Sequence, residues 1–233
     1  MLKELLSIFK GDSPLKETSV DFTRMLQIAR EMVLEANIIY WDKKGDQPEQ
    51  REALYRRDLE VNKLERAIRR RIATHLAVHA PRDVPYCLMM MSLVKDVERV
   101  GDYAKNLVDI ADLVSEPLPD HPLIQELMEI RTVVEGFADN AEQVFVTSDS
   151  ARAANLIREG RNISRRCDDL VIKTASSEFS AAVAVKVGVG ARFYKRIEAH
   201  VLNILSSVIM PLHKLDYFDE DLLPGMESDY AED

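Results

Sequence analysis

The sequence predicts an all-α protein: two tandem three-helix-bundle repeats that together form a six-helix bundle. Three observations lead to this prediction. Ala, Leu, Glu, Arg and Met, which favour helices, are abundant in the 233 residues. Apolar residues recur at helical spacing in six long segments. The nine Pro and eight Gly residues are few, and the prolines gather in the breaks between those segments.

Three helices are predicted in the first half, over residues 20–41, 48–79 and 83–114. Each has apolar residues at intervals of three and four, which place them on one face. Asp83 is expected to cap the third helix at its N-terminus, with Pro85 in the first turn. The second and third helices are therefore expected to lie side by side, joined by a tight turn.

The second half repeats this plan after a proline-rich break. Ser148 or Asp149 is expected to cap the fifth helix. Gly188 and Gly190, inside the last helix, lower helix propensity but permit close packing of a neighbouring helix. The predicted helices cover residues 123–146, 151–178 and 181–213.

A faint internal repeat supports two similar units. Aligning residues 98–107 with residues 195–204 matches Arg99 with Arg196 and Asn106 with Asn203. Short connections between helices favour a bundle. The predicted organisation is an N-terminal amphipathic segment (1–18), a first repeat (19–115), a proline-rich linker (116–122), a second, degenerate repeat (123–213) and an acidic tail (214–233).

The negative charge of the chain is concentrated in its tail. The net charge is −9, and residues 214–233 contribute −7 of it, from eight acids and one Lys, which leaves the body near neutral. No footprint for nucleic acid is present. No apolar run approaches the roughly 20 residues of a membrane span. Cys87 and Cys167 belong to no motif, so a reduced, intracellular protein is expected.

Polar residues on two neighbouring helices form a candidate site. Glu98 and Asp102 are four residues apart and project from one face, where like charges repel and weaken a helix slightly. Asp58, Asn62 and Glu65 lie along one stripe of the preceding helix. Oxygen donors on two facing helices suit a hard or borderline cation. The pattern indicates a positive group between the helices: a metal ion, an Arg or a Lys.

Glu98 and Asp102 allow a second interpretation, in which they belong to a solvated helix face and are offset by Lys95, Arg99 and Lys105. None of the five histidines follows a Glu by three residues, so the Glu-x-x-His signature of di-iron bundles is absent. The sequence also contains no glycine-rich phosphate loop and no nucleophile elbow. These observations argue against oxidase, nucleotide-hydrolysing and serine-hydrolase chemistry.

Two further groups of basic residues lie on the second helix. His75 and His79 are expected to cap the end of this helix or to lie at the surface. A run of arginines turns most of the way round the helix and is expected to be a solvated set of ion-pair partners, with a patch for a phosphate group or an acidic partner as the alternative. These arginines are Arg66, Arg69, Arg70 and Arg71.

Residues 95–107 (KDVERVGDYAKNL) resemble the signature of the PhoU family, the bacterial phosphate-uptake regulators. That signature reads approximately leucine-glutamate-arginine-isoleucine-glycine-aspartate, with an asparagine four residues later. Residues 58–65 (DLEVNKLE) resemble the acidic segment of the family on the preceding helix. The six-helix plan with an internal duplication is also similar, so the resemblance extends over residues 20–213.

This resemblance implies a cytoplasmic, non-enzymatic regulator of phosphate uptake and phosphate-starvation signalling. It implies action by protein–protein contact with a phosphate transporter component, a sensor histidine kinase or both, peripheral membrane association through such a partner, and a homodimer. It also implies a divalent or ferric metal ion, of unknown identity, held by the acidic motifs. The implied ligands are Glu98, Asp102, Asp58, Asn62 and Glu65.

The second repeat departs from the family pattern. Lys195 and Ala199 stand where the family has Glu and Asp, and Gly160 and Ser164 occupy the acidic positions of the preceding helix. An ammonium group in place of a carboxylate removes a ligand and repels a cation. At most one metal site is therefore expected.

Two other functions stay open at this stage. One is a metal-free helical adaptor of the same fold, in which the acids are merely charge-paired. The other is a metal-dependent phosphohydrolase with Asp58, Glu98 and Asp102 as metal ligands. The hydrolase is disfavoured because no general base such as His is expected near those carboxylates.

Overall fold

Helices make up nearly all of the computed structural model, which describes residues 15–42, 48–78 and 83–216. The all-α prediction is confirmed, with six α-helices in this part of the chain. The elements are α2 (Lys16–Trp41), α3 (Pro48–Val78), α4 (Val84–Asp109), the 3-10 turn η2 (Ala111–Leu113), α5 (Pro122–Thr147), α6 (Ser150–Ala175), α7 (Ala181–Ile209) and the 3-10 turn η3 (Leu212–Lys214).

Eight of the twelve helix ends lie within one residue of the predicted ends, and the other four differ by three to five residues. α2 begins at Lys16, four residues earlier than predicted. α4 ends at Asp109, because the chain tightens into η2 directly afterwards. α7 ends at Ile209, two residues before Pro211, which has no backbone N–H to continue a helix. The predicted N-terminal segment up to residue 14 and the acidic tail from residue 217 lie outside the described residues.

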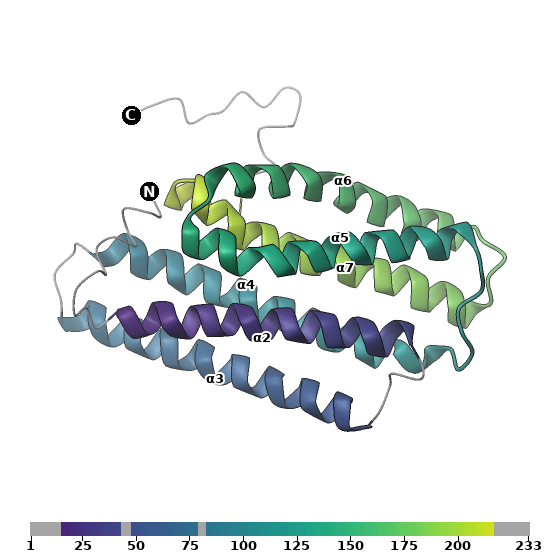
Figure 1. Cartoon of the computed structure of the whole chain (residues 1–233), viewed down its shortest axis with the longest axis horizontal. Helices are drawn as coiled ribbons and strands as arrows, with labels where there is room; N and C mark the ends of the chain where they lie inside the picture. Colours follow the sequence, from purple (N-terminus) through teal and green to yellow (C-terminus); the bar gives the residue numbers. More distant parts are fainter. Residues whose placement is uncertain (1–14, 43–47, 79–82, 217–233) are drawn as a thin grey trace.

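The six helices form two groups of three, packed face to face (Figure 1). One group contains α2, α3 and α4, and the other contains α5, α6 and α7. The groups meet where α4 packs on α7 and α2 packs on α5. α3 and α6 therefore lie on opposite outer sides of the bundle, and α4 lies between α3 and α7.

The α4–α7 contact has approximate two-fold symmetry. Tyr103 stacks on His200 with ring centroids 5.7 Å apart and an interplanar angle of 18°. Tyr103 also packs on Phe193 at 6.0 Å, and His200 Nδ1 lies 2.8 Å from Asp96 Oδ1. The repeat alignment pairs Tyr103 with His200 and Asp96 with Phe193, so these two outer contacts are equivalent. The contact of Tyr103 with Phe193 is apolar, and the contact of His200 with Asp96 is polar.

A chain of hydrogen bonds connects α2, α5 and α7 inside the bundle. Trp41 Nε1 donates to the Tyr194 hydroxyl at 2.9 Å, which in turn donates to Asn37 Oδ1 at 2.6 Å. Asn37 Nδ2 donates to Glu135 Oε1 at 2.7 Å. Burial raises the pKa of Tyr194, so this hydroxyl keeps its proton and remains a donor. The network fixes how the two groups of helices align.

Lys186 is a second polar link, with only 2% of the residue exposed. Its Nζ donates to the Ala111 carbonyl at 2.9 Å and lies 4.9 Å from the centroid of the Tyr40 ring. The Tyr40 hydroxyl donates to the Lys186 carbonyl at 2.8 Å. Gly190 makes room for that hydroxyl, because a Cβ there would lie 2.4 Å from it. The close packing expected of the glycines in α7 is confirmed at this position.

Of the N-terminal caps predicted for α6 and α4, the first is present and the second is absent. Asp149 caps α6 as predicted, accepting from the Arg152 backbone N–H at 2.9 Å. The prediction that Asp83 caps α4 is wrong, because no hydrogen bond joins its side chain to that helix end. Its Oδ2 lies instead 2.8 Å from Nε2 of His75, which is buried and so is not a surface group.

None of the described helices has a stretch that is both long enough and apolar enough to cross a bilayer.

The two glycines of α7 provide a matched pair of substitutions. Gly190→Ala should lower the free energy of unfolding by about 1–3 kcal/mol, because the new methyl displaces the buried Tyr40 hydroxyl. Gly188→Ala should raise it by about 0.5–1 kcal/mol, because a Cβ at residue 188 meets nothing within 4 Å and Ala favours the helix. Urea titration followed by circular dichroism measures both. Equal effects would contradict the packing described.

The symmetry of the α4–α7 contact predicts a compensating pair. His200→Phe alone should destabilise the fold by about 1–3 kcal/mol, because it removes a partner of Asp96, which is 6% exposed. Adding Asp96→Leu should restore most of that loss, since the equivalent contact of Tyr103 with Phe193 is apolar. A double-mutant cycle in urea measures the coupling. If the two substitutions lowered the free energy of unfolding additively, that result would contradict the equivalence of the two outer contacts.

Candidate functional site

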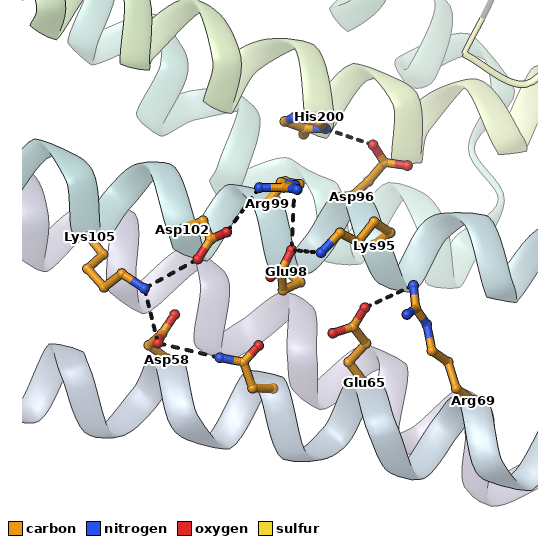
Figure 2. Close-up of polar contacts among 11 residues, drawn as sticks. Asp58, Glu65, Arg69, Lys95, Asp96, Glu98, Arg99, Asp102, Lys105 and His200 are labelled. Carbon is orange, nitrogen blue, oxygen red and sulfur yellow. Dashed lines mark hydrogen bonds and ion pairs between the residues drawn. The ribbon is translucent and has the colours of Figure 1, made fainter.

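The predicted site residues lie along the seam between α3 and α4 (Figure 2). The helical period places Asp58 and Glu65 on the face of α3 toward its neighbours, and both are buried, with 9% and 7% exposed. Glu98 on α4 is also buried, with 9% exposed. The interpretation that Glu98 lies on a solvated face is therefore wrong. Buried carboxylates need cations or hydrogen-bond donors close by.

The ammonium group of Lys105 lies between carboxylates of the two helices (Figure 2). Its Nζ donates to Asp58 Oδ2 at 3.2 Å and to Asp102 Oδ1 at 3.3 Å. Burial by itself would lower the pKa of Lys105, but the charges and hydrogen bonds of Asp58 and Asp102 outweigh burial and raise it. The lysine is therefore charged at neutral pH, and one ammonium group neutralises part of both carboxylates.

Glu98 has cations of its own. Lys95 Nζ donates to Glu98 Oε2 at 2.6 Å, and Arg99 Nε lies 3.8 Å from the same oxygen. Arg99 Nη1 also donates to Asp102 Oδ2 at 3.3 Å. The pairing of the acids with Lys95, Arg99 and Lys105, expected under the second interpretation, is confirmed. Arg99 and Lys105 join the acids into a single charge network across the seam.

The two remaining predicted ligands differ in how they relate to this network. Asn62 Nδ2 donates to Asp58 Oδ2 at 3.4 Å, so its amide supplies a hydrogen-bond donor to the network. Glu65 forms an ion pair with Arg69 of its own helix, at 3.0 Å. Hydrogen bonds and ion pairs therefore connect Asp58, Asn62, Glu98 and Asp102, and Glu65 lies beside them with a separate partner.

The predicted ligands fit a metal ion in their chemistry but not in their arrangement. Their chemistry suits a hard cation, since carboxylate and amide oxygens are its usual ligands. Their arrangement does not, because the Lys105 ammonium stands between Asp58 and Asp102. Within residues 15–42, 48–78 and 83–216, no three His, Cys, Asp or Glu side chains are grouped so that they could hold a metal ion. A metal at this seam would have to displace the lysine.

The corresponding seam of the second repeat, between α6 and α7, is built differently. Lys195 Nζ donates to Asp168 Oδ2 at 2.5 Å. Gly160 packs against Leu202, where a Cβ on the glycine would lie 2.4 Å from the leucine Cδ1. Gly160 also lies against the carboxylate of Glu198, which is 2% exposed. This close packing explains why a glycine stands at a position expected to be acidic.

Sequence reasoning missed one polar feature close to the site. Asp96 of α4 accepts from Asn203 Nδ2 at 2.9 Å and faces His200, which links the seam to α7. Its position three residues before Arg99 on the same helix face was the available signal. Cys87 and Cys167 are buried, and burial raises the pKa of their thiols to about 11 and about 12, so neither is a ready nucleophile.

Comparisons with known proteins agree with this fold. The sequence model of the PhoU domain matches residues 22–111, which contain α3, α4 and all of α2 except its first six residues. A curated relative, the phosphate-specific transport system accessory protein PhoU homolog of Synechocystis sp., is 26% identical over 155 residues, covering 64% of this chain and 68% of the relative.

Two solved structures share the whole architecture. PhoU from Pseudomonas aeruginosa superposes with a TM-score of 0.76 and 19% identity, covering 86% of this chain and 97% of its own. The phosphate transport system regulatory protein PhoU from Streptococcus pneumoniae gives 0.72 and 18%, covering 84% and 93%. The six-helix fold is thus a PhoU fold. These matches confirm the predicted resemblance to the PhoU family of phosphate transport regulators, in the domain at residues 22–111 and in the fold.

Proposed function

We propose that the chain restrains phosphate uptake and phosphate-starvation signalling by binding a phosphate transporter component, a sensor histidine kinase or both. The proposal extends the family assignment to named classes of partner. It places the protein in the cytoplasm as a homodimer that reaches the membrane through its partner. The support is the PhoU domain at residues 22–111 together with relatives named as accessory and regulatory proteins of phosphate transport.

The charge network of the α3–α4 seam is the observation that favours a role in protein–protein contact over a catalytic role. Each acid in it is already compensated by a cation of the chain, with Lys105 between Asp58 and Asp102, and Lys95 on Glu98. Carboxylates held in this way stabilise one arrangement of the two helices. The seam acts as a rigid support that presents the outer surfaces of α3 and α4 to a partner.

A metal-bound form is the second candidate, with a divalent or ferric ion at the same seam. The oxygen-donor chemistry of the residues favours it. The position of Lys105 opposes it, because the ammonium and a metal ion compete for the same carboxylates. We therefore propose that the seam is compensated by lysine, and that a metal binds only where this lysine is displaced. The ligands in that form would be Glu98, Asp102, Asp58, Asn62 and Glu65.

Removing the charge of Lys105 should reveal whether the seam can bind a metal ion. Lys105→Met keeps the length of the side chain and removes its charge, so the affinity for Mn²⁺ should rise about tenfold or more. Isothermal titration with Mn²⁺, and elemental analysis of the purified protein, measure this. Lys173→Met is the control, because Lys173 is exposed on α6 in the other repeat.

The two candidates give opposite results in the unaltered protein. Lysine compensation predicts little bound metal, and Glu98→Gln should leave partner binding unchanged. A stoichiometric metal in the purified protein, lost in both Glu98→Ala and Asp102→Ala, would instead establish the metal site and contradict lysine compensation.

The regulatory role is tested in cells. Deleting the gene should raise phosphate uptake and switch on a phosphate-starvation reporter in phosphate-rich medium, because the proposed restraint is lost. Uptake of labelled phosphate and reporter activity are the measurements, with the intact gene returned as the control. Unchanged uptake and an unchanged reporter would contradict the proposed role.

A further inference from the structure

The outer face of α3 carries a row of exposed side chains that take part neither in the packing nor in the charge network described above. Leu59, Lys63, Arg66 and Arg70 are spaced so that they form one exposed row along the helix, here called the basic stripe. Leu59 is 57% exposed. Arg66 and Arg70 are four residues apart, where like charges repel and weaken the helix. The stripe combines an exposed apolar residue with uncompensated positive charge.

Nearby acids do not neutralise the stripe. Glu60 pairs with Arg24 of α2, and Glu65 pairs with Arg69. Over the described residues, the structure shows no ion pair for Lys63, Arg66 or Arg70. The expectation that the arginine run is a set of ion-pair partners therefore holds for Arg69 and for Arg71, which pairs with Asp21, and fails for Arg66 and Arg70.

The last residues of the sequence have the complementary character. Residues 217–233 (YFDEDLLPGMESDYAED) contain seven acids and no Lys or Arg. Aromatic and aliphatic residues stand on both sides of the first acidic run, Asp219 to Asp221. An acidic segment with apolar residues matches a basic stripe with an exposed Leu, in charge and in apolar surface.

The last described residues of the chain lie level with the basic stripe along the axis of the bundle. The Asp216 backbone N–H donates to Ser206 Oγ at 3.4 Å, so the chain after α7 turns back beside this helix. Asn203 contacts Asp96 of α4, and Lys105 of α4 contacts Asp58 of α3. At about 1.5 Å per residue, these two antiparallel contacts place Ser206 nearly level with residue 70 of α3.

The residues after Asp216 also start within reach of the basic stripe. Burial raises the pKa of the Asp216 carboxyl, Asp96 raises it further and His200 lowers it, which places Asp216 close to both. Figure 2 shows α4, which carries Asp96, between His200 of α7 and Arg69 of α3. Neighbouring helices pack about 8–10 Å apart, so α3 lies about 20 Å from α7. The 17 residues that follow Asp216 could extend about 55–60 Å.

We propose that residues 217–233 bind the basic stripe of α3 in the same chain. The acids of the segment pair with Lys63, Arg66 and Arg70, and its apolar residues cover Leu59. The segment thereby occupies a surface that would otherwise bind an acidic partner, and it makes that surface available only when it is displaced. The proposal does not depend on the metal or on the identity of the regulatory partner.

The test uses a chain that ends at Asp216 and a fluorescein-labelled peptide of residues 217–233. The peptide should bind this shortened chain saturably, and its fluorescence anisotropy should show weaker binding as salt is raised, because the contact is largely ionic. The full chain should bind the added peptide about tenfold more weakly or worse, because its own segment competes at an effective concentration in the millimolar range.

Charge reversals locate the binding surface. In the shortened chain, Arg66→Glu with Arg70→Glu should weaken peptide binding at least tenfold. Arg158→Glu with Arg165→Glu is the matched control, since it makes the same charge change at two exposed arginines of α6 on the opposite side of the bundle, and should have little effect. Circular dichroism confirms that both variants are folded.

Three results would overturn the proposal. The first is no saturable binding of the peptide to the shortened chain. The second is equal weakening by the α3 and α6 reversals, which would indicate a general charge effect. The third is equal affinity of the full and shortened chains for the peptide, which would show that the segment does not occupy the stripe of its own chain.

Discussion

The antiparallel packing of α4 on α7 is the contact on which the rest of the bundle depends. α4 also packs on α2 and α3, and α7 also packs on α5 and α6, so these two helices connect every other element. Their contact is centred on Tyr103 and His200, which are equivalent in the two repeats and stack on each other. Once that pair is fixed, the position of α3 on one outer side and of α6 on the other follows from short connections.

Charge compensation within the chain is the second constraint, and it separates the two interpretations of the acidic motif. Carboxylates that are 9% exposed, such as Asp58 and Glu98, are costly unless a positive group lies beside them. A metal ion and a lysine ammonium both satisfy this requirement. Lys105 and Lys95 already do so in this chain. A motif that resembles a metal site can therefore be stable, and can hold two helices in register, without a metal.

Periodicity was sufficient to predict the six helices and the facing of Asp58 toward Asp102, because both follow from 3.6 residues per turn and an antiparallel turn. It named Lys95, Arg99 and Lys105 as possible partners of the acids but could not decide between them and a metal ion, since the direction of a long side chain such as Lys105 depends on the packed neighbour. It also failed where tertiary contact overrides local preference. Asp83 contacts the buried His75 instead of capping α4, and His200 contacts Asp96 across 104 residues of sequence.

The internal repeat offers an independent argument about Lys105. The alignment of the last helices of the two repeats places Leu202 opposite Lys105, and the acidic position of Asp58 corresponds to Gly160. In the first repeat Lys105 and Asp58 form an ion pair, and in the second Leu202 packs directly onto Gly160. Base and acid are thus both present in one repeat and both absent in the other. That is the pattern expected if Lys105 is the structural partner of Asp58, because a buried carboxylate without its cation would destabilise the seam, as would a buried ammonium without its acid.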